Sequence, residues 1–164
     1  MKIMKKSLSF AFLFSVLMSL TLVACSKDKD DKDLEKPVIE AGSETLPQNC
    51  QVYTKGEEIP FRCIFTDNEG LGNYNIEIHN NFEHHSHSTD AGDCALDAKK
   101  DPVNPWVYNK DFTIPGNPLR YDAQVDIPIP ADIDPGDYHF MVRVTDKAGW
   151  QELRAVSIKI LEKE

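Results

Sequence analysis

Alternation of apolar and polar residues is the dominant pattern of this chain from Pro37 onward. Short alternating segments are separated by Gly, Pro, Asn and Asp, and no window keeps a convincing helical period. We therefore predict an all-β domain of roughly 125 residues with one core. The expected strands are Val38–Ala41, Gln51–Thr54, Ile59–Thr66, Asn73–Asn80, Trp106–Ile114, Tyr121–Ile129, Tyr138–Thr145 and Leu153–Leu161.

Two details indicate an immunoglobulin-like β-sandwich with Greek-key connections and about seven to nine strands. Asp134, Gly136 and Tyr138 stand at the D-x-G-x-Y spacing of a tyrosine corner, a Tyr whose hydroxyl bonds nearby backbone. The segments FTDNEGLGNYNIEI and VRVTDKAGW each run from a strand through Asp and Gly into a turn. The strand from Asn73 then corresponds to strand C and that from Tyr138 to strand F, with a long insertion after strand C.

The first 24 residues have a different pattern, a basic start followed by one apolar run. Three lysines precede a stretch that ends in Leu-Val-Ala-Cys, which resembles a bacterial lipobox whose cysteine, here Cys25, is acylated. The alternative is a single transmembrane anchor. The run is only marginally long for a span of about 20 residues and contains four Ser or Thr. We expect residues 1–24 to be a lipoprotein signal peptide and Cys25 to attach the chain to the membrane.

Charge separates the remaining chain into a tether and a domain. Residues 25–36, CSKDKDDKDLEK, are almost wholly charged and predict a solvated tether before a domain over residues 37–164. After Cys25 becomes the first residue, 15 Lys or Arg face 27 Asp or Glu, a net charge of −12. Such a surface repels phosphates, so nucleic acid is not an expected partner. The Lys/Asp-rich run is similar to surface-export signals of some Gram-negative lineages, so we expect a surface-exposed outer-membrane lipoprotein; a spacer on the periplasmic face would have the same composition.

The mature domain resembles the lipoprotein family known as domain of unknown function 4625. The resemblance rests on GEEIPFRCIFTD, TDNEGL, IHNNFEHHSH and IPADIDPGDYHFMVRVTDKAGW, and it covers most of residues 37–161. It implies an Ig-like fold on a cell-envelope anchor and supplies no activity, so the site has to be sought among the residues.

Histidines are concentrated in one short stretch, because four of the five lie within nine residues. Strands C and F are antiparallel neighbours in an Ig sheet, and alternation places both His79 and the distant His139 on the outer face. Directly paired positions have Cβ atoms about 5 Å apart, close enough to share a metal ion. If the following segment is extended, Glu83, His85 and His87 share one face, and neutral imidazoles suit Zn²⁺, Cu²⁺ or Ni²⁺. The expected ligands are His79, His85, His87 and His139, with His84, Glu83, Asp93 and Cys94 as alternates.

The alternative is an idle, solvated loop, since a histidine-rich tract is a compositional signal only.

Cysteine pairing is also open. Cys63 alternates with Phe61 and Phe65 and is expected in the core, which makes Cys50–Cys94 the preferred disulfide. Cys50–Cys63 and Cys63–Cys94 remain alternatives, as does a Cys94 thiolate near the histidines.

Acidic and amide side chains gather in the B–C and F–G loops at the opposite end of the sandwich. Oxygens of Asp67, Asn68, Glu69 and Asp146 could hold Ca²⁺ there, although capping of turns is the simpler role.

No HExxH, G-x-S-x-G or P-loop motif is present, so we do not expect an enzyme. The expected function is a lipid-anchored cell-envelope protein that binds a transition metal, zinc or copper, for capture, buffering or delivery. The alternative is an adhesion or accessory module that contacts an outer-membrane protein partner without metal.

Overall fold

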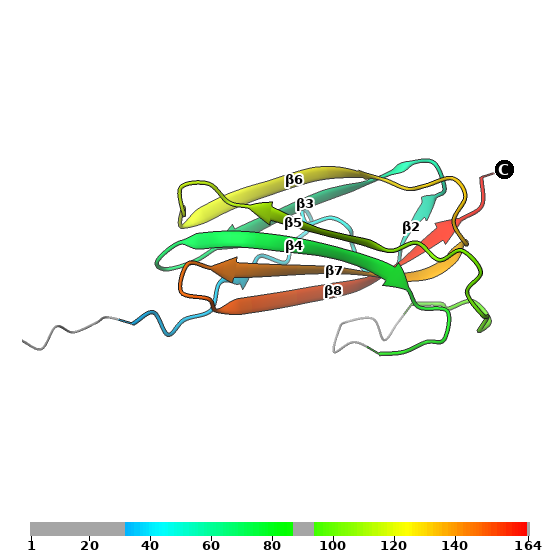
Figure 1. Cartoon of the computed structure of the whole chain (residues 1–164), viewed down its shortest axis with the longest axis horizontal. Coiled ribbons are helices and arrows are strands. Elements are labelled where there is room, and N and C mark those ends of the chain that lie inside the picture. The colour runs from blue at the N-terminus through cyan, green and yellow to red at the C-terminus, as the bar shows by residue number, and fades with distance from the viewer. Residues whose placement is uncertain (1–31, 87–93, 164) are drawn as a thin grey trace, which may run out of the picture. The chain divides into compact units, whose positions relative to one another are not determined.

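The computed structural model describes residues 32–86 and 94–163, whose regular structure consists of eight β-strands (Figure 1). A compact unit begins at Asp33. All eight strands predicted from the alternation are present, with ends displaced by no more than two residues. The strands are β1 Val38–Ile39, β2 Gln51–Thr54, β3 Glu58–Thr66, β4 Leu71–Asn80, β5 Tyr108–Thr113, β6 Arg120–Pro128, β7 Gly136–Asp146 and β8 Gln151–Leu161.

The strands form two facing sheets, of order β1-β3-β6 and β2-β8-β7-β4-β5. The pairs are antiparallel except β2–β8, which is parallel. In Ig terms β3, β4, β7 and β8 stand where strands B, C, F and G are expected, so that C lies beside F. The fold is the immunoglobulin-like β-sandwich that the alternation and the D-x-G-x-Y spacing predict.

Alternation decides which side chains enter the core. On β3, Ile59, Phe61, Cys63 and Phe65 are buried while the residues between them are not. Phe61 stacks on Phe140 from the opposite sheet with ring centroids 5.8 Å apart. Burial of each such large side chain contributes about 1.5–3 kcal/mol, which is why a one-residue slip of register is excluded.

The one free cysteine of the described residues, Cys63, lies in this core as expected. Burial raises the pKa of its thiol to about 12, so it remains neutral and acts as a small apolar side chain.

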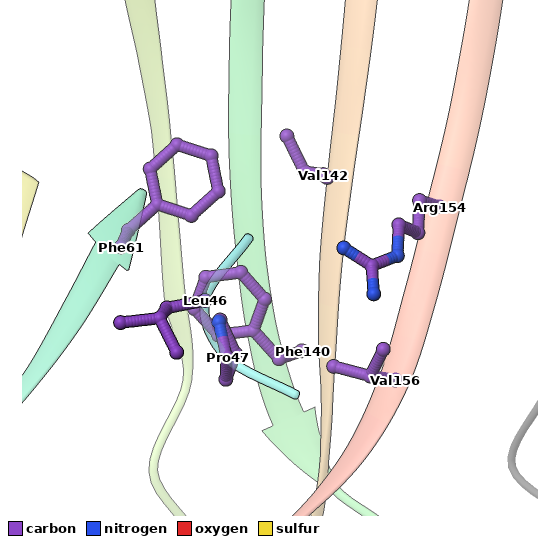
Figure 2. Close-up of a pocket in the computed structure, with 7 residues that line it drawn as sticks. All are labelled: Leu46, Pro47, Phe61, Phe140, Val142, Arg154 and Val156. Atoms are coloured by element: carbon purple, nitrogen blue, oxygen red, sulfur yellow. The ribbon is translucent and has the colours of Figure 1, made fainter. Parts of the chain in front are cut away.

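One side of the sandwich is closed by the segment before β2. Leu46 and Arg62 exchange two backbone hydrogen bonds, of 2.8 and 3.2 Å, which hold this segment against β3. Figure 2 shows Arg154 reaching from β8 toward β7 over the small hollow that remains. The cavity of about 10 Å³ holds one water molecule at most, so it offers no ligand site. Its lining consists of Leu46, Pro47, Phe61, Phe140, Val142, Arg154 and Val156.

The tyrosine corner is formed as predicted and fixes the start of β7. The fully buried Tyr138 hydroxyl donates to the Asp134 carbonyl at 2.6 Å and accepts from the Trp106 backbone N–H at 3.3 Å. Burial raises the pKa of Tyr138 to about 12, which keeps the hydroxyl protonated as a donor. The corner thereby fixes which face of β7 each following residue occupies.

The long insertion between β4 and β5 is attached to the sandwich at several points. A disulfide joins Cys94 in the insertion to Cys50 beside β2, the pairing preferred from the sequence. The Asp134 carboxylate accepts the backbone N–H groups of Val103 and Asn104 at 2.7 and 2.8 Å. These contacts hold the insertion beside the end of the sheet where β4 stops and β7 starts.

Candidate metal centre

His79 and His139 are direct partners across the antiparallel pair β4–β7. Their neighbours Ile78 and Phe140 are paired in the same register and point into the core, which turns both imidazoles to the outer face. The two ring centroids lie 5.5 Å apart. The side-by-side placement predicted from alternation is therefore present in the fold.

The described residues directly after β4 form a turn, so the extended segment on which Glu83 and His85 were expected to share one face is not present. β4 ends at Asn80, the His84 N–H donates to the Asn81 carbonyl at 3.1 Å, and His84 has a φ of +60°. The physical reason is Phe82, which is 2% exposed and packs edge-on against the Tyr138 ring at 5.4 Å. Burial of this phenyl ring stabilises the turn.

Glycine is required beneath this turn. Gly136 has a φ of +129°, and a Cβ at this position would lie 3.1 Å from Cε1 of Phe82. The glycine of the D-x-G-x-Y motif thus leaves room for the phenyl ring that bends the chain.

The turn carries His85 back over the paired histidines. His85 Nε2 lies 3.3 Å from His79 Nε2, and the two rings are within 12° of parallel. The His85 and His139 ring centroids are 5.1 Å apart. Two nitrogens that each bind a tetrahedral Zn²⁺ at about 2.0–2.1 Å lie roughly 3.4 Å from one another. The spacing of the two Nε2 atoms is therefore compatible with a shared ion.

Polar contacts indicate how the imidazole rings are turned. Glu77 Oε1 lies 3.1 Å from His79 Nδ1, within ion-pair distance, while His79 Nε2 is the nitrogen that lies toward His85. His139 Nε2 donates to the His85 carbonyl at 3.1 Å, so Nδ1 of that ring carries the lone pair. Glu77 was not among the sequence candidates, although its place two residues before His79 puts it on the same strand face.

The three histidines of the centre differ in how far they are buried. His139 faces outward from its sheet, yet it is only 1% exposed because the turn with His85 covers it. The His79 side chain is 17% exposed and His85 is exposed. An ion would therefore reach the centre from the side of His85.

The other sequence candidates occupy different places. His84 is half-buried, and its Nε2 is enclosed without a hydrogen-bond partner among the described residues, while Glu83 points to solvent. His87 and Asp93 lie outside the described residues. The role of Cys94 as an alternate ligand is corrected, because a sulfur in a disulfide has no thiolate to offer.

Comparisons with known proteins place the chain in a family. No curated protein matches it. Among solved structures, that of murine CRIg aligns with 79% of this chain and 100% of its own, at 14% identity and a TM-score of 0.34. Within residues 32–86 and 94–163, no helix has the length and apolar character needed to cross a bilayer. A model described as domain of unknown function (DUF4625) matches residues 23–161, a range that includes all eight strands. The chain belongs to this DUF4625 family.

Proposed function

We propose that this protein is a lipid-anchored component of the cell envelope that binds a transition metal ion, zinc or copper. The ligands would be His79, His85 and His139, with His87, two residues after His85 in the sequence, as a further ligand. One observation carries the proposal: a cross-strand histidine pair receives a third imidazole whose Nε2 lies 3.3 Å from that of His79.

The donor set supports this class of ion. Imidazole nitrogens suit Zn²⁺ and Cu²⁺ and are poor ligands for Mg²⁺ or Ca²⁺. Glu77 supports the same conclusion, because its carboxylate lies 3.1 Å from Nδ1 of His79 and a carboxylate beside a metal-binding histidine commonly orients the ring. Two of the three rings belong to adjacent strands of one sheet, so the site is largely formed before an ion arrives.

The remaining parts of the proposal come from the sequence. The Leu-Val-Ala-Cys ending of the apolar run supports acylation of Cys25, and the Lys/Asp-rich run after it supports an outer-membrane lipoprotein at the cell surface. A histidine centre on such an anchor fits capture, buffering or delivery of the ion. The absence of recognisable catalytic motifs supports a binding role over an enzymatic one.

The deciding experiment is isothermal titration of the purified full-length protein, in detergent and without a histidine tag, with Zn²⁺ and separately with Cu²⁺. His139→Ala should weaken binding at least about tenfold, as should His85→Ala, although the two positions are far apart in sequence. His84→Ala is the matched control and should bind like the wild type. If His139→Ala retains wild-type affinity, or if neither ion binds, the fold-built metal centre is wrong, and the histidine segment is better explained as a partner-facing loop.

A further inference from the structure

A second group of candidate ligands lies at the other end of the β4–β7 pair. Asp33, Asp67 and Asp146 each contribute a carboxylate oxygen, and these three atoms lie within 4.8 Å of one another. They come from the segment before β1, the β3–β4 turn and the end of β7, which Figure 1 shows gathered at one end of the domain. Asp146 lies seven positions after His139 in β7, a distance of roughly 23 Å along the strand.

In Asp67 and Asp146, one carboxylate oxygen already accepts backbone N–H groups of its own turn. Asp67 Oδ2 accepts the backbone N–H groups of Glu69, at 2.9 Å, and Gly70, at 2.5 Å. Asp146 Oδ1 accepts those of Gly149 and Trp150 at 2.6 and 2.9 Å. These bonds are the turn capping expected from the sequence, and they fix the direction of both carboxylates.

Asp33 is drawn to the same place by bonds of its own. Its Oδ1 accepts from the Asn68 side-chain amide and from the Glu35 backbone N–H, both at 3.1 Å. Its carbonyl accepts the indole N–H of Trp150 at 2.8 Å. The last part of the predicted tether is therefore attached to both turns by hydrogen bonds.

Capping leaves the second oxygen of each carboxylate unexplained. Asp33 Oδ2, Asp67 Oδ1 and Asp146 Oδ2 are all enclosed and have no hydrogen-bond donor in the described part of the chain. The Asp146 residue is only 3% exposed. None of the ion pairs between described residues includes these three aspartates; the nearby Lys147 pairs with Glu69 instead, at 3.3 Å.

Such an arrangement is unfavourable for the protein alone. An enclosed carboxylate oxygen without a donor loses its hydration with no replacement. Three carboxylates whose oxygens converge also repel one another. A bound cation reduces both penalties at once, because it ligates a carboxylate oxygen of each aspartate and neutralises the charge.

We propose that Asp33, Asp67 and Asp146 form a Ca²⁺ site, independent of the histidine centre. Ca²⁺ takes oxygen ligands at about 2.3–2.6 Å, so two ligands on opposite sides of the ion are up to about 5 Å apart. The three oxygens lie within 4.8 Å of one another, so all three can ligate one ion of this size. Mg²⁺ demands a near-ideal octahedron at about 2.0–2.1 Å and usually keeps several waters, so a site of three protein carboxylates favours Ca²⁺. Ca²⁺ also fits a site with variable geometry that water completes.

The site joins the start of the domain to its two turns. Asp33 belongs to the segment before β1, whereas the other two ligands belong to the sandwich. Bound Ca²⁺ therefore holds this segment against the domain. Trp150, whose indole N–H contacts the Asp33 carbonyl, reports on this event by its fluorescence.

The test is a Ca²⁺ titration of the full-length protein in detergent after treatment with EDTA, followed by Trp fluorescence and thermal unfolding. Ca²⁺ should raise the unfolding temperature, and Mg²⁺ at the same concentration should raise it less. Asp146→Asn keeps an acceptor for the Gly149 and Trp150 N–H groups while it replaces the free oxygen. It should weaken Ca²⁺ binding at least about tenfold and, in EDTA, unfold at a temperature no lower than the wild type.

Asp33→Ala is the second variant, because it lies outside the strands and can be made without disturbing the core. It should also lose the Ca²⁺-dependent rise, whereas the exposed Asp101→Asn should keep it in full. His139→Ala should keep it as well, so failure of the histidine centre and failure of this site are separable. An unchanged unfolding temperature in Ca²⁺, an equal rise with Mg²⁺, or a wild-type Ca²⁺ response in Asp146→Asn would each overturn the proposal.

Discussion

The Tyr138 hydroxyl offers a direct measurement of what the tyrosine corner contributes. In Tyr138→Phe, the Asp134 carbonyl and the Trp106 N–H each lose a hydrogen-bond partner. A buried group left without a partner destabilises the fold by about 1–3 kcal/mol. The Trp106 bond is long, at 3.3 Å, and the Asp134 carbonyl is only partly buried, so we expect about 2–3 kcal/mol for the two together rather than the sum of two full penalties.

Tyr53→Phe is the matched control for this substitution. Tyr53 is also buried, at 7% exposure, but its hydroxyl has no hydrogen-bond partner among the described residues. Removal of an unpaired buried hydroxyl leaves nothing unsatisfied, so this variant should be as stable as the wild type or more stable. The two substitutions remove the same atom from the same kind of residue and differ only in what that atom bonds.

Urea unfolding followed by circular dichroism measures the difference. With a slope of about 1–3 kcal/mol/M for a domain of this size, the expected loss lowers the Tyr138→Phe midpoint by roughly 1 M or more, while the Tyr53→Phe midpoint stays at or above that of the wild type. Equal midpoints for the two variants would refute the reasoning. They would mean that the corner hydrogen bonds are exchanged for water at no net loss.

Four further predictions concern the histidine centre, the core, the tyrosine corner and the anchor. Glu77→Gln should weaken Zn²⁺ binding about 10–100-fold in isothermal titration, because the carboxylate that orients His79 is lost; unchanged affinity would show that Glu77 plays no part. Cys63 should resist a thiol reagent at pH 8 and react only on unfolding, since the pKa of its thiol is raised to about 12 by burial. Burial also raises the pKa of the Tyr138 hydroxyl, to about 12, so the native state favours the neutral hydroxyl. The stability that depends on this hydroxyl should be fully present below pH 10 and should fall as the pH rises toward 12, which alkaline unfolding measures. Cys25→Ser should not incorporate a fatty-acid probe, and normal labelling would remove the lipoprotein proposal.

The strands and the His79–His139 pair were predictable because both depend on a period of two. Each strand alternates clearly enough to reveal its inward face, and the tyrosine corner fixes the phase of β7. Once Tyr138 is assigned to the core side, His139 must lie on the other face. Antiparallel pairing with β4 then sets it beside His79.

The two features that escaped prediction depend on single contacts between distant segments. The turn at His84 forms because Phe82 finds space beside Gly136 and Tyr138, about fifty residues later in the chain. Asp33 lies within a run of charge that reads as a solvated tether, yet bonds from Asn68 and Trp150 attach it to the sandwich. Neither contact leaves a periodic trace in the sequence, so local pattern cannot reveal it.

The two candidate sites lie at opposite ends of the domain, so these ends differ in their chemistry. The chain enters the sandwich at the end that holds Asp33, whereas His79 and His139 lie at the far end of the same pair of strands. The paired strands β4 and β7 hold these two ends roughly 23 Å apart. The histidines are therefore separated from the point at which the described chain enters the domain by most of the length of β7.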